Sequence, residues 1–280
     1  MLRFLRHYLL AIQFFTRIPV TGRLADWVGF SPALLRASAG HFPGVGVVVG
    51  ALVAGLTLLL LAALPCSPFA PLVAAVLGTV LSVMVTGGFH EDGLADVADG
   101  LGGSSDRERA LVIMKDSRVG AFGVLAVVLA LLAKVSLLAL IGAVSPLWMV
   151  LGIFAAHVVS RTWPLLLIRL MPHVGDAAGS KSKPLADQIS LTSLLAAGIW
   201  CFAALALVYL ARVAMVLGAD GALGGFSAQP MGAGLLASGL AWVYMGRLLW
   251  RRLQGFTGDG LGATQQVCEI AFYLGLAVAL

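Results

Sequence analysis

Long apolar runs dominate this 280-residue sequence and restrict it to a chain that crosses a membrane. A helix needs roughly 20 apolar residues to span the hydrocarbon core of a bilayer. Hydrophobic residues make up 60% of the chain and charged residues 11%, whereas a soluble domain has only about 25% charged residues. We therefore expect an all-α, polytopic integral membrane bundle with about seven transmembrane helices, and one membrane domain over residues 1–280. The expected spans are 45–64, 72–85, 121–143, 147–160, 191–217, 231–249 and 264–280.

The positions of the basic residues predict which side of the membrane each loop faces. With seven spans, the N-terminal arm and the basic stretches 107–118, 161–183 and 247–252 all fall on one side. Positively charged loops favour the cytoplasm. We therefore expect a multi-pass protein of the bacterial inner membrane, with these loops in the cytoplasm and the C-terminus on the far side. Residues 1–19 are too interrupted to span and predict an uncleaved interfacial helix in contact with membrane lipid.

The segment 86–120 carries more than half of the acidic residues in an otherwise weakly charged chain. If it is helical, Asp92, Asp96 and Asp99 share one face. Carboxylates this close repel one another and need a cation. Mg²⁺ takes one or two protein carboxylates and leaves other positions for water and phosphate oxygens. The segment therefore predicts a Mg²⁺ site for phosphoryl transfer in which these aspartates are metal ligands and catalytic residues; a solvated acidic loop is the alternative.

His90 precedes these acids, and three roles stay open for it: metal ligand, phosphate contact or capping residue. A helix that included residue 90 would point His90 away from the aspartates, so a joint site needs a chain break at Gly87-Gly88.

Four basic residues are candidates for binding phosphate. Lys115 and Arg118 can share a helix face and clamp diphosphate oxygens, although a membrane anchor explains their charge equally well. Gly120 and Gly123 follow them and permit close backbone approach. Arg161 and Lys181 are further candidates, with lipid headgroups as the alternative ligand.

Two acids near the C-terminus need separate explanations. Asp259 lies between glycines before the last span, as a substrate or metal ligand or as a helix cap. Glu269 lies inside the last apolar run and must face protein or a cation. Lys134 is its candidate partner in a buried ion pair.

The basic residues and the cysteines argue against a nucleic-acid partner and against a cysteine-based site. The net charge is +5, but the basic residues form no clustered face, so we expect no nucleic-acid partner. The three cysteines show no CxxC or Cys/His pattern, so we expect neither a disulfide nor a zinc site.

Six sequence blocks resemble, in the same order, those of the cobalamin synthase family, the adenosylcobinamide-GDP ribazoletransferases. Glu91 departs from the family pattern, which more often has an apolar residue there, so we assign it no catalytic role. The blocks are Phe15-Thr16-Arg17-Ile18-Pro19, Phe42-Pro43-x-x-Gly46, His90-Glu91-Asp92-Gly93-Leu94-Ala95-Asp96 with Asp99-Gly100, Met114-Lys115-Asp116-Ser117-Arg118-x-Gly120, Ser160-Arg161, and Gly258-Asp259-x-Leu261-Gly262-Ala263.

The resemblance implies a specific reaction. The 3′-hydroxyl of α-ribazole or its 5′-phosphate would attack the cobinamide-side phosphorus of adenosylcobinamide-GDP, and GMP would leave, with Mg²⁺ required. Lys115, Arg118 and Arg161 would neutralise the developing charge. A carboxylate or His90 would take the proton. Association with other cobalamin-assembly enzymes is a further implication.

Two other functions compete with this interpretation. Asp96-x-x-Asp99-Gly100 is loosely similar to the motif of CDP-alcohol phosphotransferases, but that motif continues with Ala-Arg, and here Leu101 follows. A transporter could use Glu269 and Lys134 with the acidic segment as an ion path. Against it, the acids cluster in one segment and do not recur in a second half.

Overall fold

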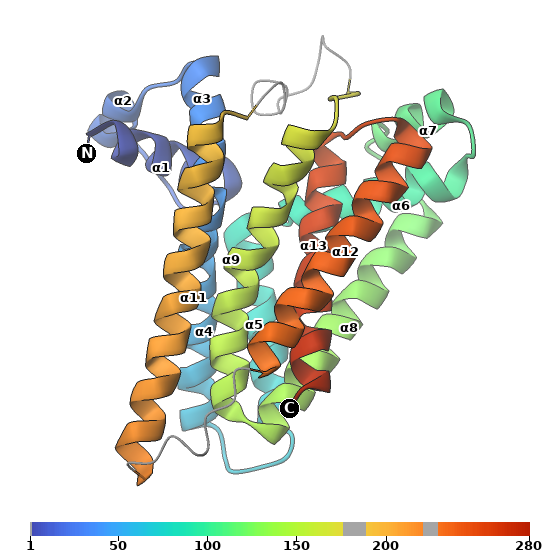
Figure 1. Ribbon diagram of the computed structural model, residues 1–280. Coiled ribbons are helices and arrows are strands. Elements are labelled where there is room, and N and C mark those ends of the chain that lie inside the picture. The colour runs from blue at the N-terminus through green and yellow to red at the C-terminus, as the bar shows by residue number, and fades with distance from the viewer. Residues whose placement is uncertain (1, 176–188, 221–228) are drawn as a thin grey trace.

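The computed structural model describes residues 2–175, 189–220 and 229–280, which are almost entirely helical (Figure 1). No β-strand occurs within these ranges, so the predicted all-α class is confirmed. In chain order the helices are α1 (Leu2–Phe15), α2 (Gly22–Val28), α3 (Pro32–Ser38), the 3₁₀ helix η1 (Ala39–His41), α4 (Phe42–Ala63), α5 (Ala70–Thr86), α6 (Phe89–Gly103), α7 (Arg107–Met114), α8 (Ala121–Val144), α9 (Pro146–Leu170), α11 (Leu191–Asp220), α12 (Gln229–Leu253) and α13 (Gly258–Val278).

The chain is a multi-pass membrane protein. In its described part, five stretches are long and apolar enough to cross a membrane, and they contain α4, α8, α9, α11 and α13. The bent pair α5 and α6 makes a sixth if it counts as one span. The predicted number of about seven also included α12. This helix packs against α13 along the bundle (Figure 1), but it is less apolar than the others.

The two termini lie at opposite ends of the bundle, as predicted (Figure 1). Helices α1, α2, α3 and α7 gather at one end, and the C-terminus lies at the other. Helix α1 exposes Leu2, Phe4 and Leu5, the kind of apolar surface that an interfacial helix presents to lipid.

Helix α9 runs through the centre of the bundle and packs closely on α4. The glycines of α4 allow this close approach of the two helices. A Cβ atom at Gly46 would lie 2.3 Å from the carbonyl oxygen of His157, and one at Gly50 would lie 3.1 Å from that of Phe154. Helix α9 is also longer than predicted, because it continues past residue 160 and through Pro164 to Leu170.

A sharp bend at Gly87-Gly88 separates α5 from α6, which meet at 88°. Gly87 has φ +68° and Gly88 has φ +71°, a left-handed conformation that favours glycine. Beyond the bend, α6 crosses the bundle and packs on α8 and α13. The acidic segment therefore lies across neighbouring helices and does not continue the line of α5 (Figure 1).

Candidate active site

The three aspartates of α6 differ in their exposure to solvent. The predicted helical spacing is confirmed, with Asp92 exposed, Asp96 half-buried and Asp99 buried. Gly93 faces α13 so closely that a Cβ atom there would lie 2.8 Å from the carbonyl oxygen of Asp259. This contact brings Asp259, in the first turn of α13, beside the acids of α6.

Asp96 lies at the centre of this group of acids. Among the described residues, the charges that act on Asp96 come from Asp259, Asp92 and Asp99, and all of them are negative. We call Asp92, Asp96 and Asp259 the open acid cluster. Because these carboxylates repel one another, the cluster has the charge of a cation-binding site.

Asp99 has a structural contact that the sequence did not indicate. Its Oδ2 accepts from Gly120 N at 2.7 Å and its Oδ1 from Gly123 N at 2.8 Å. Gly120 and Gly123 were predicted to allow close backbone approach, and the group that approaches them is this carboxylate. Asp99 therefore caps the start of α8 and fixes it to α6.

The structure does not bring His90 or Arg161 to the open acid cluster. Helix α6 includes residue 90, so His90 points into the bundle, where it is 1% exposed and its ring stacks on Phe42 with centroids 5.7 Å apart. Arg161 is also 1% exposed, and its Nη1 donates to the carbonyl oxygen of His157 at 2.9 Å. Neither side chain reaches the surface that a soluble substrate approaches.

The other predicted phosphate ligands have different surroundings. Arg118 is exposed and forms an ion pair with Asp116 at 2.5 Å, and its hydrogen bonds lower the pKa of Asp116 to about 2. Lys115 is exposed at the C-terminal end of α7. Lys181 lies outside the described residues.

Asp259 is not the cap of α13. The Thr257 side chain takes that role, because its hydroxyl accepts from Gly260 N at 3.0 Å. This leaves the half-buried carboxylate of Asp259 available to a ligand.

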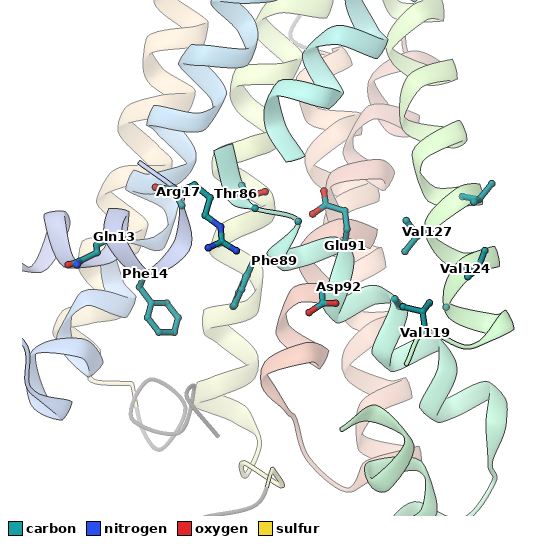
Figure 2. Close-up of a pocket in the computed structure, with 16 residues that line it drawn as sticks. Gln13, Phe14, Arg17, Thr86, Phe89, Glu91, Asp92, Val119, Val124 and Val127 are labelled. Atoms are coloured by element: carbon teal, nitrogen blue, oxygen red, sulfur yellow. The ribbon is translucent and has the colours of Figure 1, made fainter. Parts of the chain in front are cut away.

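A cavity of about 880 Å³ lies beside the bend between α5 and α6. Figure 2 shows Glu91 and Asp92 on α6, with Arg17 over the turn between Thr86 and Phe89. The opposite wall is apolar and comes mainly from α8. Arg17 lies in the block of residues 15–19 that resembles the family, but the sequence predicts no role for its side chain. The remaining labelled lining residues are Gln13, Phe14, Val119, Val124 and Val127.

A second group of charges lies inside the bundle. Lys134 Nζ and Glu269 Oε1 are 2.6 Å apart, with side chains 3% and 1% exposed, so the predicted buried ion pair is confirmed. Glu269 also accepts from Gln265 Nε2 at 2.7 Å and from the Tyr273 hydroxyl at 3.1 Å. Both oxygens of Glu269 are therefore occupied by protein groups.

Comparison with known proteins identifies the family. The family model for cobalamin-5-phosphate synthase matches residues 7–277. The chain belongs to this family. It is 70% identical over 280 residues to a protein of Albidiferax ferrireducens, with 100% of both chains covered. A Polaromonas sp. protein is 61% identical, covering 99% of this chain and 98% of its own, and one from Vibrio cholerae is 40% identical, covering 95% and 91%.

All three relatives are named adenosylcobinamide-GDP ribazoletransferase. No solved structure matches this cobalamin-5-phosphate synthase family member. The match runs from α1 to α13, so it includes both helices that carry the open acid cluster.

The donor chemistry of this family member fits Mg²⁺. Within the described ranges, no three His, Cys, Asp or Glu side chains are already gathered in a metal-binding arrangement. Mg²⁺ does not need such a cage, because it is bound through one or two carboxylates with water and substrate phosphates. The open acid cluster offers oxygen ligands with no cation among the charges acting on Asp96.

Proposed function

We propose that this chain is an adenosylcobinamide-GDP ribazoletransferase of the membrane. The 3′-hydroxyl of α-ribazole or of α-ribazole 5′-phosphate attacks the cobinamide-side phosphorus of adenosylcobinamide-GDP. GMP leaves, and the product is adenosylcobalamin or its 5′-phosphate. The observation that carries the proposal is the open acid cluster, held beside an 880 Å³ cavity in a chain with full-length relatives of that name.

Mg²⁺ is the proposed cofactor, and Asp92 and Asp96 are its proposed ligands, with Asp259 beside them. When bound, Mg²⁺ would neutralise diphosphate charge as the phosphorus–oxygen bond to GMP breaks. The contacts of Asp99 with α8 support a different role from the predicted one: Asp99 positions α6, so that Asp92 and Asp96 face the ligand.

A carboxylate is the proposed acceptor of the hydroxyl proton. Asp92 lines the cavity and is exposed, while the ring of His90 is enclosed and stacked on Phe42. This arrangement favours the carboxylate over the histidine, because a general base must come within hydrogen-bond reach of the proton that it takes.

The other candidates for substrate contact are basic residues, which could bind the negatively charged diphosphate. Lys115 and Arg118 precede Val119 in the chain, and Val119 lines the cavity. Both basic side chains are therefore proposed to contact the diphosphate as it enters. Buried Arg161 acts through the packing of α9, away from the substrate. Lys181 remains a candidate contact on the basis of sequence alone.

The proposed location is the bacterial inner membrane, with the cavity open to the cytoplasm. Helices α1 and α7, from the predicted cytoplasmic stretches, lie at the same end of the bundle (Figure 1), where nucleotide-linked substrates are available. Helix α1 would rest on membrane lipid through its exposed apolar residues. Association with other cobalamin-assembly enzymes is proposed on family grounds alone.

The experiment is a nucleotide-release assay on the purified chain in proteoliposomes with Mg²⁺. We expect GMP from adenosylcobinamide-GDP plus α-ribazole 5′-phosphate, and no CMP from CDP-diacylglycerol plus an alcohol acceptor. CMP release without GMP release would replace the proposal with a phospholipid phosphotransferase. Substrate-dependent ion flux without a nucleotide product would replace it with a transporter.

A further inference from the structure

Arg17 is a cationic residue in the cavity wall for which the family reaction, as described above, gives no role. It follows α1, and its backbone N donates to the carbonyl oxygen of Val85 at 2.7 Å, which ties this turn to the end of α5. Its side chain is exposed and lines the same cavity as Asp92. The backbone bond therefore fixes the base of a long side chain whose guanidinium lies against the bend (Figure 2).

In this conformation the Arg17 side chain occupies the space beside the backbone of Gly87. A Cβ atom at Gly87 would lie 2.2 Å from Arg17 Nε, far inside van der Waals contact. At the neighbouring Gly88, which has nearly the same φ, a Cβ atom would meet nothing within 4 Å. The left-handed turn explains a glycine at either position, but only at residue 87 does the Arg17 side chain occupy the space that a Cβ atom would take.

The guanidinium has no ion-pair partner among the residues that the structure describes. Glu91 also lines the cavity, but its Oε1 accepts from Gln266 Nε2 at 3.0 Å and its Oε2 has no hydrogen-bond partner among the described residues. Asp92 belongs to the open acid cluster, whose charge suits a cation. The cavity wall therefore presents the positive Arg17 and, from the open acid cluster, the negative Asp92. This pair of charges is complementary to a phosphate group that carries its own metal ion.

We propose that Arg17 is a substrate-binding residue that donates to non-bridging oxygens of the diphosphate in adenosylcobinamide-GDP. It would hold the diphosphate from the side of the bend, while the metal-bearing carboxylates hold it from α6. A guanidinium can bind two such oxygens at once, which fixes the orientation of the phosphorus toward the attacking hydroxyl. This inference rests on the proposed function and adds a specific contact to it.

The first test compares kinetic constants for GMP release in proteoliposomes. We expect Arg17→Ala to lower kcat/KM for adenosylcobinamide-GDP by about 10- to 100-fold, mainly by raising KM for this substrate. Arg17→Lys should lie between Arg17→Ala and the unmodified protein, because it keeps the charge without the planar donors. Arg23→Ala, an exposed arginine in α2 away from the cavity, should match the unmodified protein. Binding of a fluorescent GDP analogue with Mg²⁺ should weaken in the same order.

The outcomes separate the two proposals. Absence of GMP release from the unmodified protein would overturn the proposed function. Normal GMP release from that protein, with Arg17→Ala unchanged in KM and in GDP binding, would overturn the Arg17 inference alone.

A second pair of variants tests the role of the bend without touching the arginine. Gly87→Ala and Gly88→Ala impose similar backbone strain at adjacent positions, but only the first displaces the guanidinium. We expect Gly87→Ala to raise KM several-fold more than Gly88→Ala at comparable thermal stability. Gly22→Ala, with φ +59° and open space around it, controls for strain outside the cavity. Equal KM values for the two bend variants would contradict the inference.

Discussion

Helix α13 carries two acidic residues in opposite surroundings. Glu269 is 1% exposed and meets Lys134, with further hydrogen bonds from Gln265 and Tyr273. Asp259 is half-buried and lies beside Asp96, whose charged neighbours are all acidic among the described residues. Burial alone would single out Glu269 as the functional residue. The ion pair indicates Asp259 as the functional residue, because Glu269 already has a cation as its partner and does not need a ligand.

The largest effect should come from breaking the buried pair. Glu269→Leu leaves the buried ammonium of Lys134 without its partner inside the bundle, so it should lower the free energy of unfolding by about 3–5 kcal/mol. Thermal unfolding in detergent measures this effect. The double variant Lys134→Met with Glu269→Leu should recover most of the loss. If the single variant is as stable as the unmodified protein, the ion pair does not stabilise the bundle.

Substitution in the open acid cluster should reduce activity and leave stability unchanged, the opposite of substitution in the buried ion pair. Asp96→Asn removes a repulsive charge, so thermal stability should be unchanged or slightly higher. GMP release should fall about 100-fold, the size typical of losing one electrostatic group at a reacting centre. Asp26→Asn, an exposed acid of α2, is the matched control and should keep full activity. Near-normal GMP release from Asp96→Asn would show that the cluster is not part of the active site.

Asp99 lies on α6 with Asp92 and Asp96, but we expect it to stabilise the fold and not to bind the metal. Asp99→Ala removes two hydrogen bonds to the start of α8 and should cost about 1–2 kcal/mol of stability. Hydrogen exchange should become faster in the first turn of α8. Asp106→Ala, which removes one exposed capping bond to Arg109 N, should cost less. Equal losses from the two variants would argue against a special role of Asp99 at the junction of α6 and α8.

The smallest effect should come from the exposed pair near α7. Asp116→Asn releases Arg118 from its ion pair, and because exposed pairs contribute little, KM for GMP release should change by less than about threefold. The pKa of Asp116 is lowered to about 2, so the carboxylate stays ionised through the neutral range and is protonated only as the pH falls toward that value. A change in KM of more than about tenfold would contradict this small contribution of the exposed ion pair.

Local patterns in the sequence predicted much of this molecule. The apolar runs indicated the membrane-spanning helices, the glycine pair indicated the bend, and the spacing of the acids placed them on one face of a helix. Each of these features depends on residues close together in the chain.

The corrections concern contacts between distant segments. Asp99 is bonded to the start of α8, and the buried guanidinium of Arg161 lies over the ring of Phe42 from α4. Arg17 lies beside Gly87 because its backbone, just after α1, is hydrogen-bonded to Val85 near the end of α5. Hydrophobic periodicity carries no information on such pairings, and the ion pair of Lys134 with Glu269 was predictable only because an apolar span leaves few other partners for either charge.

The most direct test of the account is divalent-metal binding measured apart from turnover. Mn²⁺ suits the same oxygen ligands as Mg²⁺, and electron paramagnetic resonance can follow its binding to the protein in lipid nanodiscs with GDP present. We expect Asp96→Asn to weaken Mn²⁺ binding at least about 10-fold, since one charged ligand is lost, while Asp26→Asn should bind like the unmodified protein. Undiminished Mn²⁺ binding by Asp96→Asn would contradict the claim that the unpaired carboxylates of α6 hold the metal.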